Sequence, residues 1–259
     1  MSEPVLQTAK LTQRFGSLVA LDNLDLELHQ GDVFGFIGPN GAGKSTTMKI
    51  LAGLMQQSSG SAKVLGKEVK ENGDFVRRNV GYMPDFLGVY DDLTVVEYLD
   101  FFASAYGIPR SQRHKIVDDV LELTDLSFKR TAMVDSLSRG MTQRLSLARV
   151  LVHDPPVLLL DEPASGLDPR ARIEIRELIR ELQRMGKTII ISSHILSELG
   201  EFKQARHHRA RQAAGLRHDR RLDGAGAGAI EHHDQNRRRC LTGDGFARQR
   251  SARGIDRSA

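Results

Sequence analysis

Residues 38 to 46 carry the most specific pattern in the chain. In order they are Gly38, Pro39, Asn40, Gly41, Ala42, Gly43, Lys44, Ser45 and Thr46. They match in full the pattern G-x-x-x-x-G-K-[ST], in which glycines let backbone N–H groups turn inward around phosphate oxygens. Lys44 supplies a positive charge near the β- and γ-phosphates, and the Ser45 hydroxyl is a ligand for Mg²⁺. The stretch therefore predicts a nucleoside triphosphate site.

The segments on either side of this turn have the character that the pattern requires. Val33 to Ile37 is a short apolar run, typical of a buried strand, and a helix is predicted from Lys44 to about Met55. Such a helix points its positive end at the anion. The alternative, a glycine-rich turn that binds nothing, leaves this strand–turn–helix context unexplained.

Short apolar runs recur along the chain and alternate with helical patterns. Further strands are predicted at Leu24–Leu28, Ser61–Leu65, Val80–Met83, Val157–Leu160 and Thr188–Ser192. Asp168 and Pro169 have the residue types of a helix start, and that helix is expected to end near Gly186. The alternation predicts an α/β fold with a mainly parallel sheet.

The stretch from about residue 91 to 153 reads as mostly helix. Thr94 and Glu97 form a capping-box pattern that opens a helix through Phe102. The spacing of Val117, Val120 and Leu121 fits an amphipathic helix. We therefore predict a helical insert in the α/β domain.

Two carboxylates follow the apolar run Val157–Leu160 directly. Asp161 and Glu162 would lie at the carboxyl edge of a parallel sheet, where ligands bind in open α/β folds. Asp161 is placed to hold Mg²⁺, and Glu162 to polarise a water for attack on the γ-phosphate. Two acids after a strand would ordinarily be a solvated loop, but the phosphate loop favours the catalytic interpretation.

The charge of the chain is unevenly distributed. The net charge is +4, yet residues 201–259 hold 13 Arg and 1 Lys against 7 acidic residues, so the first 200 residues are net acidic. The body therefore gives no charge argument for nucleic-acid binding. No apolar run is long enough to span a bilayer, the start has no signal-peptide pattern, and a lone cysteine excludes a disulfide framework. We expect a cytoplasmic protein that reaches membranes only by docking.

Together these motifs resemble the ABC (ATP-binding cassette) ATPase family over about residues 5–202. Residues 138–143, which begin Ser138-Arg139-Gly140, are similar to the family signature S-G-G-Q, with Arg139 and Met141 in place of the usual Gly and Gln. Residues 165–168 resemble the D-loop, and Ser192-Ser193-His194 resembles the switch histidine. A Met-containing signature is typical of export-type members.

The resemblance implies roles for several residues. Ser138 and Gly140 would face the ATP of a second subunit, Asp168 would contact across the dimer, and His194 would reach the γ-phosphate. Phe15 would stack on adenine, although an aromatic residue near a strand end is more often core. Asp85 occupies the place of the Q-loop glutamine, where it would bind nucleotide and ligate Mg²⁺; as a carboxylate it adds a charge and removes an amide donor.

The family also implies the overall fold, the cofactors and the partners. The fold would be a RecA-like P-loop NTPase with N-terminal antiparallel β strands and a helical subdomain at about 91–153. ATP and Mg²⁺ would be bound, a second ABC ATPase subunit would complete the sandwich, and transmembrane permease subunits would dock at the inner face of the cell membrane. The alternatives are an ABC-type regulatory ATPase that never meets a membrane and a frameshifted fragment without function.

The resemblance stops abruptly near Phe202. Leu, Ile, Val and Phe number only 7 of the 59 residues from Glu201 on, and five of the nine histidines lie there. Arginine also replaces lysine almost completely, which out-of-frame reading of GC-rich codons would produce. We therefore expect an ATPase domain at 1–202 and an Arg-rich, disordered, frameshift-derived tail at 203–259. A basic linker and a nucleic-acid-binding arm are the alternatives.

Overall fold

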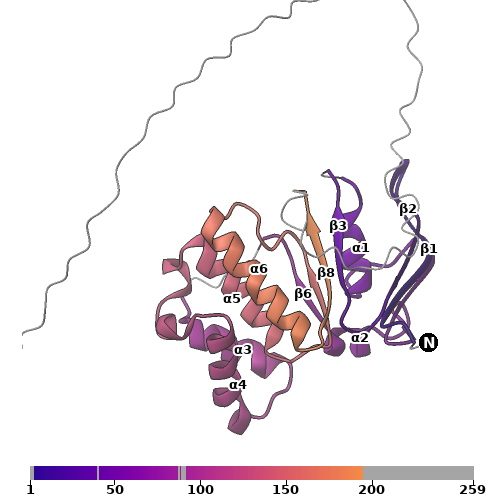
Figure 1. Cartoon of the computed structure of the whole chain (residues 1–259). Coiled ribbons are helices and arrows are strands. Elements are labelled where there is room, and N and C mark those ends of the chain that lie inside the picture. Colours follow the sequence, from indigo (N-terminus) through magenta and orange to yellow (C-terminus); the bar gives the residue numbers. More distant parts are fainter. Residues whose placement is uncertain (1–2, 40, 87, 89–91, 195–259) are drawn as a thin grey trace, which may run out of the picture. The chain divides into compact units, whose positions relative to one another are not determined.

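The computed structural model describes residues 3–39, 41–86, 88 and 92–194 of the 259-residue chain. The described part contains two four-stranded sheets and the helices packed on them (Figure 1). Asn40, the tail 203–259 and the boundary predicted at residue 202 lie outside the described residues.

The first sheet is antiparallel, with the strand order β2-β1-β4-β5. Its strands are β1 (Leu6–Phe15), β2 (Leu18–Leu28), β4 (Ser59–Val64) and β5 (Lys67–Glu68). The predicted alternation in β2 is confirmed, because Leu24, Leu26 and Leu28 are all buried. The N-terminal antiparallel strands that the resemblance implies are confirmed, but the residues of β1 were not placed, since irregularities in its pairing between Thr8 and Arg14 break the period of two.

The second sheet is parallel, with the strand order β3-β8-β7-β6. Its strands are β3 (Val33–Ile37), β6 (Val80–Met83), β7 (Val157–Leu160) and β8 (Thr188–Ser193). The parallel sheet that the sequence predicts is therefore confirmed. Because all four strands run the same way, their carboxyl ends meet at one edge, directly before the predicted site residues.

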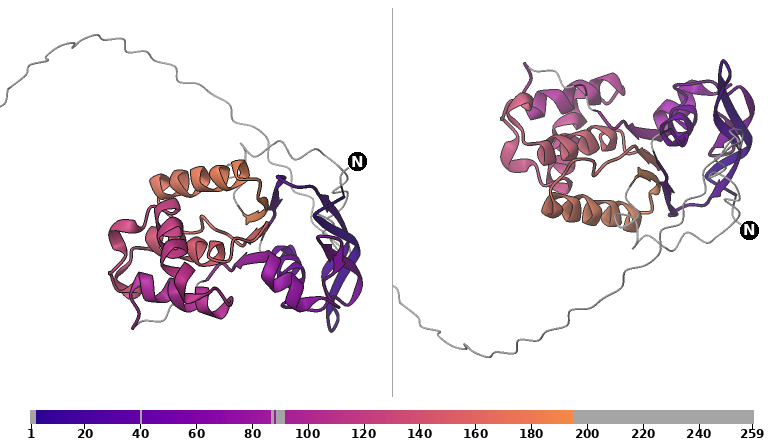
Figure 2. Two further views of the ribbon diagram at one scale, coloured as in Figure 1. Left: turned by 90° about the horizontal axis from the view of Figure 1, so that it is seen from below. Right: turned by 90° about the horizontal axis from the view of Figure 1, so that it is seen from above.

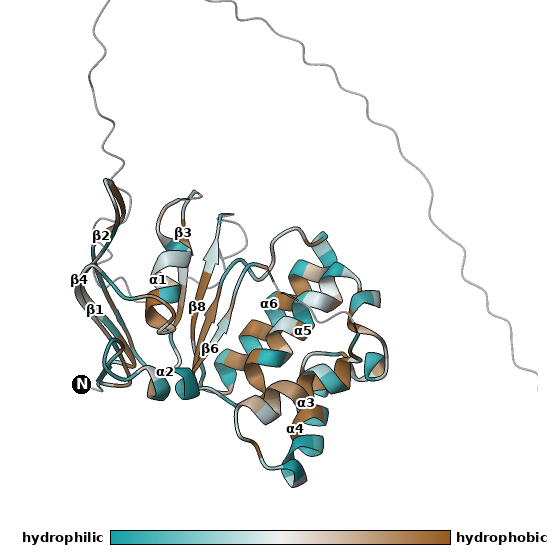
Figure 3. Ribbon diagram, turned by 180° about the vertical axis from the view of Figure 1, so that it is seen from behind, coloured by the Kyte–Doolittle hydropathy of each residue, from teal (hydrophilic) through white to brown (hydrophobic). Residues whose placement is uncertain are grey.

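Each face of the parallel sheet belongs to its own hydrophobic core. Along β7, Leu158 and Leu160 join the core under the helices that follow residue 92, whereas Val157 and Leu159 join the core shared with α1 (Lys44–Leu51) and the antiparallel sheet. Burial on both faces explains why this strand is an unbroken apolar run. Brown, apolar residues lie along α3 and β8 in Figure 3.

Four helices pack on one face of the parallel sheet, and α1 with the antiparallel sheet covers the other (Figure 2). The four are α3 (Val95–Ala105), α4 (Arg110–Leu123), α5 (Arg139–Leu151) and α6 (Pro169–Arg184). The short α2 (Gly73–Asn79), η1 (Ser127–Lys129) and η2 (Val134–Ser136) complete the described helices. None of the helices in the described ranges has the length and hydrophobicity needed to cross a membrane.

Two helix boundaries differ from the sequence-based expectation. α1 ends at Leu51, not near Met55, because Gly53 turns the chain with a φ of 70°. α3 continues past Phe102 to Ala105. The predicted start of α3 is confirmed: the Glu97 N–H donates to Thr94 Oγ1 at 3.4 Å, and the Thr94 N–H donates to Glu97 Oε2 at 2.9 Å.

The cap of α3 gives a test of the helical region. Thr94→Ala removes the hydroxyl that accepts from the first turn, so we expect the free energy of unfolding to fall by about 1 kcal/mol. Ser104→Ala, at an exposed position in the same helix, is the control and should change it by less than about 0.5 kcal/mol. Denaturant unfolding of both variants measures the difference. Equal stabilities of the two variants would show that the cap does not hold this helix.

Candidate functional site: a phosphate loop beside two strand-end acids

The phosphate loop connects β3 to α1 at the carboxyl edge of the parallel sheet. Gly41 and Gly43 have φ values of 85° and 79°, a conformation that residues with a Cβ rarely adopt. A Cβ on Gly43 would also come within 2.5 Å of the Ala20 carbonyl oxygen. Both positions therefore favour glycine; the motif predicts it at Gly43, whereas Gly41 falls on one of its unspecified positions.

Lys44 lies inside this loop and is only 7% exposed. Its Nζ donates to the carbonyl oxygens of Gly38 at 2.5 Å and Pro39 at 3.3 Å. It is also 3.6 Å from Glu162 Oε1. The ammonium thus ties the loop to the end of β7. Ser45, exposed, and Thr46, half-buried, follow it in the first turn of α1.

The acidic strand end is held by the neighbouring strand. Ser192 Oγ on β8 donates to Asp161 Oδ1 at 2.6 Å and accepts from the Glu162 N–H at 2.8 Å. The Asp161 N–H donates to the Met83 carbonyl on the other side, at 2.8 Å. Asp161 is 3% exposed, and Glu162 has a φ of 52°, an uncommon backbone conformation that turns its side chain out of the strand. The sequence analysis gave Ser192 no role.

Glu162 is the meeting point of the predicted catalytic residues. Its Oε2 lies 2.9 Å from His194 Nδ1 at the end of β8, while its Oε1 faces Lys44 and has no hydrogen-bond partner within the described residues. The side chain is 12% exposed. The tertiary structure therefore brings Lys44, Glu162 and His194 into one cluster at the sheet edge.

Asp85 and Tyr82 add to the electrostatics of this edge. Burial, followed by the charges of Asp161 and Glu162, raises the pKa of Asp85 above its usual value. Burial and then Asp161 raise the pKa of Tyr82 to about 12, so this tyrosine stays neutral beside the acids. We assigned Tyr82 no role from the sequence, because its place near Asp161 follows only from the pairing of β6 with β7.

The predicted metal ligands have the chemistry that Mg²⁺ prefers, because Ser45, Asp85 and Asp161 offer hard oxygen atoms. Within the described residues no group of three or more acidic, histidine or cysteine side chains is placed to hold a metal ion.

The signature and D-loop residues cap two helices. Ser138 Oγ accepts from the Met141 N–H at 3.4 Å at the start of α5, and Asp168 Oδ1 accepts from the N–H groups of Arg170 and Ala171 at 2.9 and 3.0 Å at the start of α6. Gly140 in α5 faces Ala171 in α6, since a Cβ built on Gly140 would be 3.4 Å from the Ala171 Cβ. The predicted cap by Asp168 is confirmed.

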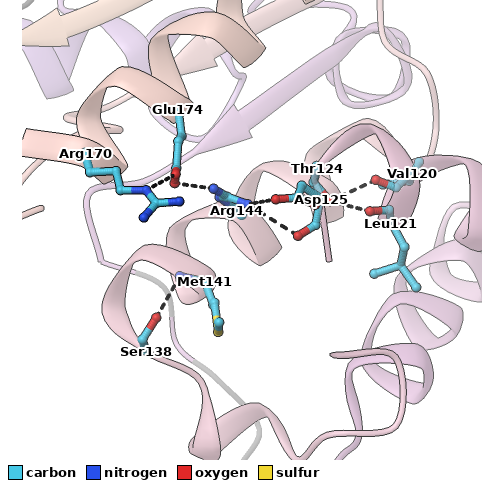
Figure 4. A network of polar contacts seen from close by, with 9 residues as sticks. All are labelled: Val120, Leu121, Thr124, Asp125, Ser138, Met141, Arg144, Arg170 and Glu174. Atoms are coloured by element: carbon cyan, nitrogen blue, oxygen red, sulfur yellow. Dashed lines mark hydrogen bonds and ion pairs between the residues drawn. The ribbon is translucent and has the colours of Figure 1, made fainter. Parts of the chain in front are cut away.

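An ionic network fixes α5 relative to its neighbours (Figure 4). Arg144 pairs with Asp125 at 2.7 Å and with Glu174, which also accepts from Arg170 Nε at 3.1 Å. The Arg144 side chain is only 14% exposed. Sequence reasoning missed this network, because its members lie on α5, α6 and the end of α4, far apart in the chain.

Other predicted residues stay apart from the cluster. Phe15 is 47% exposed at the end of β1, beside the exposed Leu18 and Val19. No hydrogen bond or ion pair between described residues joins Phe15, Ser138 or Asp168 to the Lys44–Glu162–His194 cluster. Gly38, Pro39, Gly41, Ala42 and Gly43 form the described part of the loop, without Asn40.

Comparison with known proteins gives the class to which this fold and site belong. The family described as ABC transporter matches residues 21–165. Two solved structures support the same class: an ATP-binding subunit of an ABC transporter, with a TM-score of 0.68 and 29% identity over 76% of this chain and 82% of that chain, and cbiO1 from Clostridium perfringens, part of the ABC transporter complex cbiONQ, with a TM-score of 0.69 and 28% identity over 78% and 82%. The chain belongs to the ABC transporter family.

Curated relatives within the family are named as ATP-binding proteins. Nod factor export ATP-binding protein I of Cupriavidus pinatubonensis is 38% identical over 194 residues, which are 75% of this chain and 60% of that protein. The probable multidrug ABC transporter ATP-binding protein YbhF of Escherichia coli is 38% identical over 196 residues, 76% of this chain and 34% of that protein. The chain thus spans less than two thirds of the length of these relatives.

The hydroxyl of Ser192 gives a test of how the acidic strand end is held. Ser192→Ala leaves Asp161 and the Glu162 N–H without a buried partner, so the free energy of unfolding should fall by about 1–3 kcal/mol. Ser146 is the matched control, because its buried Oγ has no hydrogen-bond partner among the residues that the structure describes. Ser146→Ala should be neutral or slightly stabilising by denaturant unfolding. If both variants cost the same, the Ser192 hydrogen bonds contribute nothing specific.

Proposed function

We propose that this chain is the ATP-binding and ATP-hydrolysing subunit of an ABC transporter. The observation that carries the proposal is the cluster at the sheet edge, where Lys44 of the phosphate loop meets Glu162 and His194. Three strands deliver these residues to one point, with a glycine cradle beside them. The family membership and the relatives' names support the same function.

The geometry suggests how the residues divide the work. Lys44 holds loop carbonyls and faces Glu162, contacts that phosphate oxygens of ATP can replace with stronger charge-assisted ones. Glu162 is oriented through Oε2 by His194, which leaves Oε1 to accept a proton from an attacking water. His194 Nε2 remains for the γ-phosphate. Ser45, Asp161 and Asp85 would hold Mg²⁺, which would supply positive charge beside the phosphates.

The signature points to a second subunit. Ser138, Gly140 and Asp168 stay apart from the cluster of their own chain, which suits the role of contacting ATP and the D-loop of a partner ATPase subunit across a sandwich. ATP-driven closure of the pair would act on transmembrane permease subunits at the inner face of the membrane. The exposed Phe15 would stack on adenine. Relatives named for export favour the outward direction.

Two substitutions separate chemistry from binding. Glu162→Gln keeps the shape of the side chain but cannot take a proton, so turnover should fall by about two to four orders of magnitude while ATP binding persists and a nucleotide-bound dimer accumulates. Lys44→Ala should instead weaken ATP binding itself. Calorimetry and steady-state hydrolysis with the partner subunits present measure both. Normal turnover of Glu162→Gln, or unchanged affinity of Lys44→Ala, would contradict the assignment.

Capture of the wild-type chain on membranes tests the partner. Recovery of a permease would identify that partner and exclude a regulatory ATPase that never meets a membrane.

We also propose that the segment from residue 203 on is not the family's own continuation and arises from a shift of reading frame. The unusual amino-acid composition of this segment is the first support for the proposal, and the exposed edge of the parallel sheet is the second. Within the described residues β3 pairs only with β8, and Ile37 at its end is 47% exposed. An edge strand of this kind normally needs cover.

The gene sequence tests this proposal directly. Translation of the other two frames beyond codon 202 should reveal a run of alternating apolar residues and a glycine turn, because the family continues there with strands that finish the sheet. Restoring that frame should raise the yield of soluble protein. A gene with no such run in either frame, together with a protease-resistant tail, would refute the shift and support a natural basic segment.

A further inference from the structure

Arg139, the second residue of the signature, lies against the turn that follows the acidic strand end. A Cβ built on Gly166 would overlap the guanidinium carbon and both terminal nitrogens of Arg139. Gly166 has a φ of 66°, a conformation that residues with a Cβ rarely adopt. The missing Cβ leaves room for the guanidinium of Arg139. The contact joins the start of α5 to the D-loop of the same chain.

The charge of Arg139 also reaches the end of β6. It acts on Asp85 with the opposite sign to Asp161 and Glu162, and it lowers the pKa that burial and those two acids raise; His194 acts in the same direction as Arg139. The guanidinium therefore lies against Gly166 while its charge acts on the acidic edge.

The position of Arg139 is set by its own subunit. α5 is tied to α6 and to the end of α4 through Arg144, Glu174 and Asp125 (Figure 4). α6 in turn begins at Asp168, two residues after Gly166. The backbone that carries Arg139 and the turn that receives its side chain are thus parts of one framework.

We infer that Arg139 serves the ATP site of its own subunit, as a positioning residue that holds the Gly166 turn, whose Ser165 N–H donates to the Glu162 carbonyl at 3.0 Å. The inference rests on the proposed ATPase function. It assigns Arg139 the opposite direction to Ser138 and Gly140, which the resemblance directs at the partner's ATP. Arg139 stands where the family usually has Gly, so its side chain fills a space that the usual signature leaves open.

Substitutions at position 139 separate charge from shape. Arg139→Met keeps most of the length without the charge and should lower kcat for ATP hydrolysis by about tenfold with little change in KM, because Lys44 still binds the phosphates. Arg139→Lys keeps the charge and should recover a large part of that loss. Arg184→Met, which removes a 69% exposed guanidinium from the last turn of α6, away from this network, is the control and should leave kcat unchanged.

Mixed pairs of full-length chains with two affinity tags decide which subunit Arg139 serves. One pair combines an Arg139→Met chain with a Lys44→Ala chain. The other combines a chain that carries both substitutions with a wild-type chain. The two pairs contain the same substitutions and differ only in their distribution. If Arg139 serves its own site, the second pair keeps one intact site and hydrolyses ATP several-fold faster than the first.

The reverse order, with the first pair faster, would show that Arg139 acts on the partner's ATP and would overturn the inference. Equal rates in the two pairs would overturn it as well, because Arg139 would then affect both sites or neither. Failure of the proposed function looks different: wild-type pairs would not hydrolyse ATP, or Lys44→Ala pairs would match them, before any comparison of mixed pairs is made.

Discussion

The close approach of Lys44 to Glu162 is the constraint on which the site depends. Both side chains are nearly excluded from water, and a buried charge without its counter-charge costs several kcal/mol. The lysine belongs to the loop after β3 and the glutamate to the end of β7, so their pairing requires β8 to lie between these strands in register. The strand order of the parallel sheet is therefore required for the pairing of these charges at its edge.

Ser192 makes that register specific. One hydroxyl on β8 bonds both to the carboxylate of Asp161 and to the backbone N–H of Glu162. A shift of β8 by one residue would turn this hydroxyl to the opposite face and would also remove His194 from Glu162. The apolar residues before Ser192 bury both faces of the strand, and this burial holds the register against the cost of gathering acids at one edge.

The helices are joined to one another by polar contacts as well as by their hydrophobic core. Arg144 links α5 to α6 and α4, and the first residues of α5 and α6 lie together through Gly140 and Ala171. A movement of the helices relative to the sheet would therefore displace the signature and the D-loop together. The proposed function needs such a coupling, because nucleotide-dependent closure would have to reach the permease subunits.

The sequence alone determined the local features: the strand–glycine loop–helix unit around Lys44, the capping box at Thr94, the cap at Asp168 and the apolar strand before Asp161. Each depends on neighbours within a few residues, where backbone conformation and side-chain type suffice. The strand β1, the ties through Ser192 and Arg144, and the seat of Arg139 on Gly166 could not be predicted in this way. They join segments distant in the chain, so only the packing of two cores on opposite faces of one sheet decides which of these side chains meet.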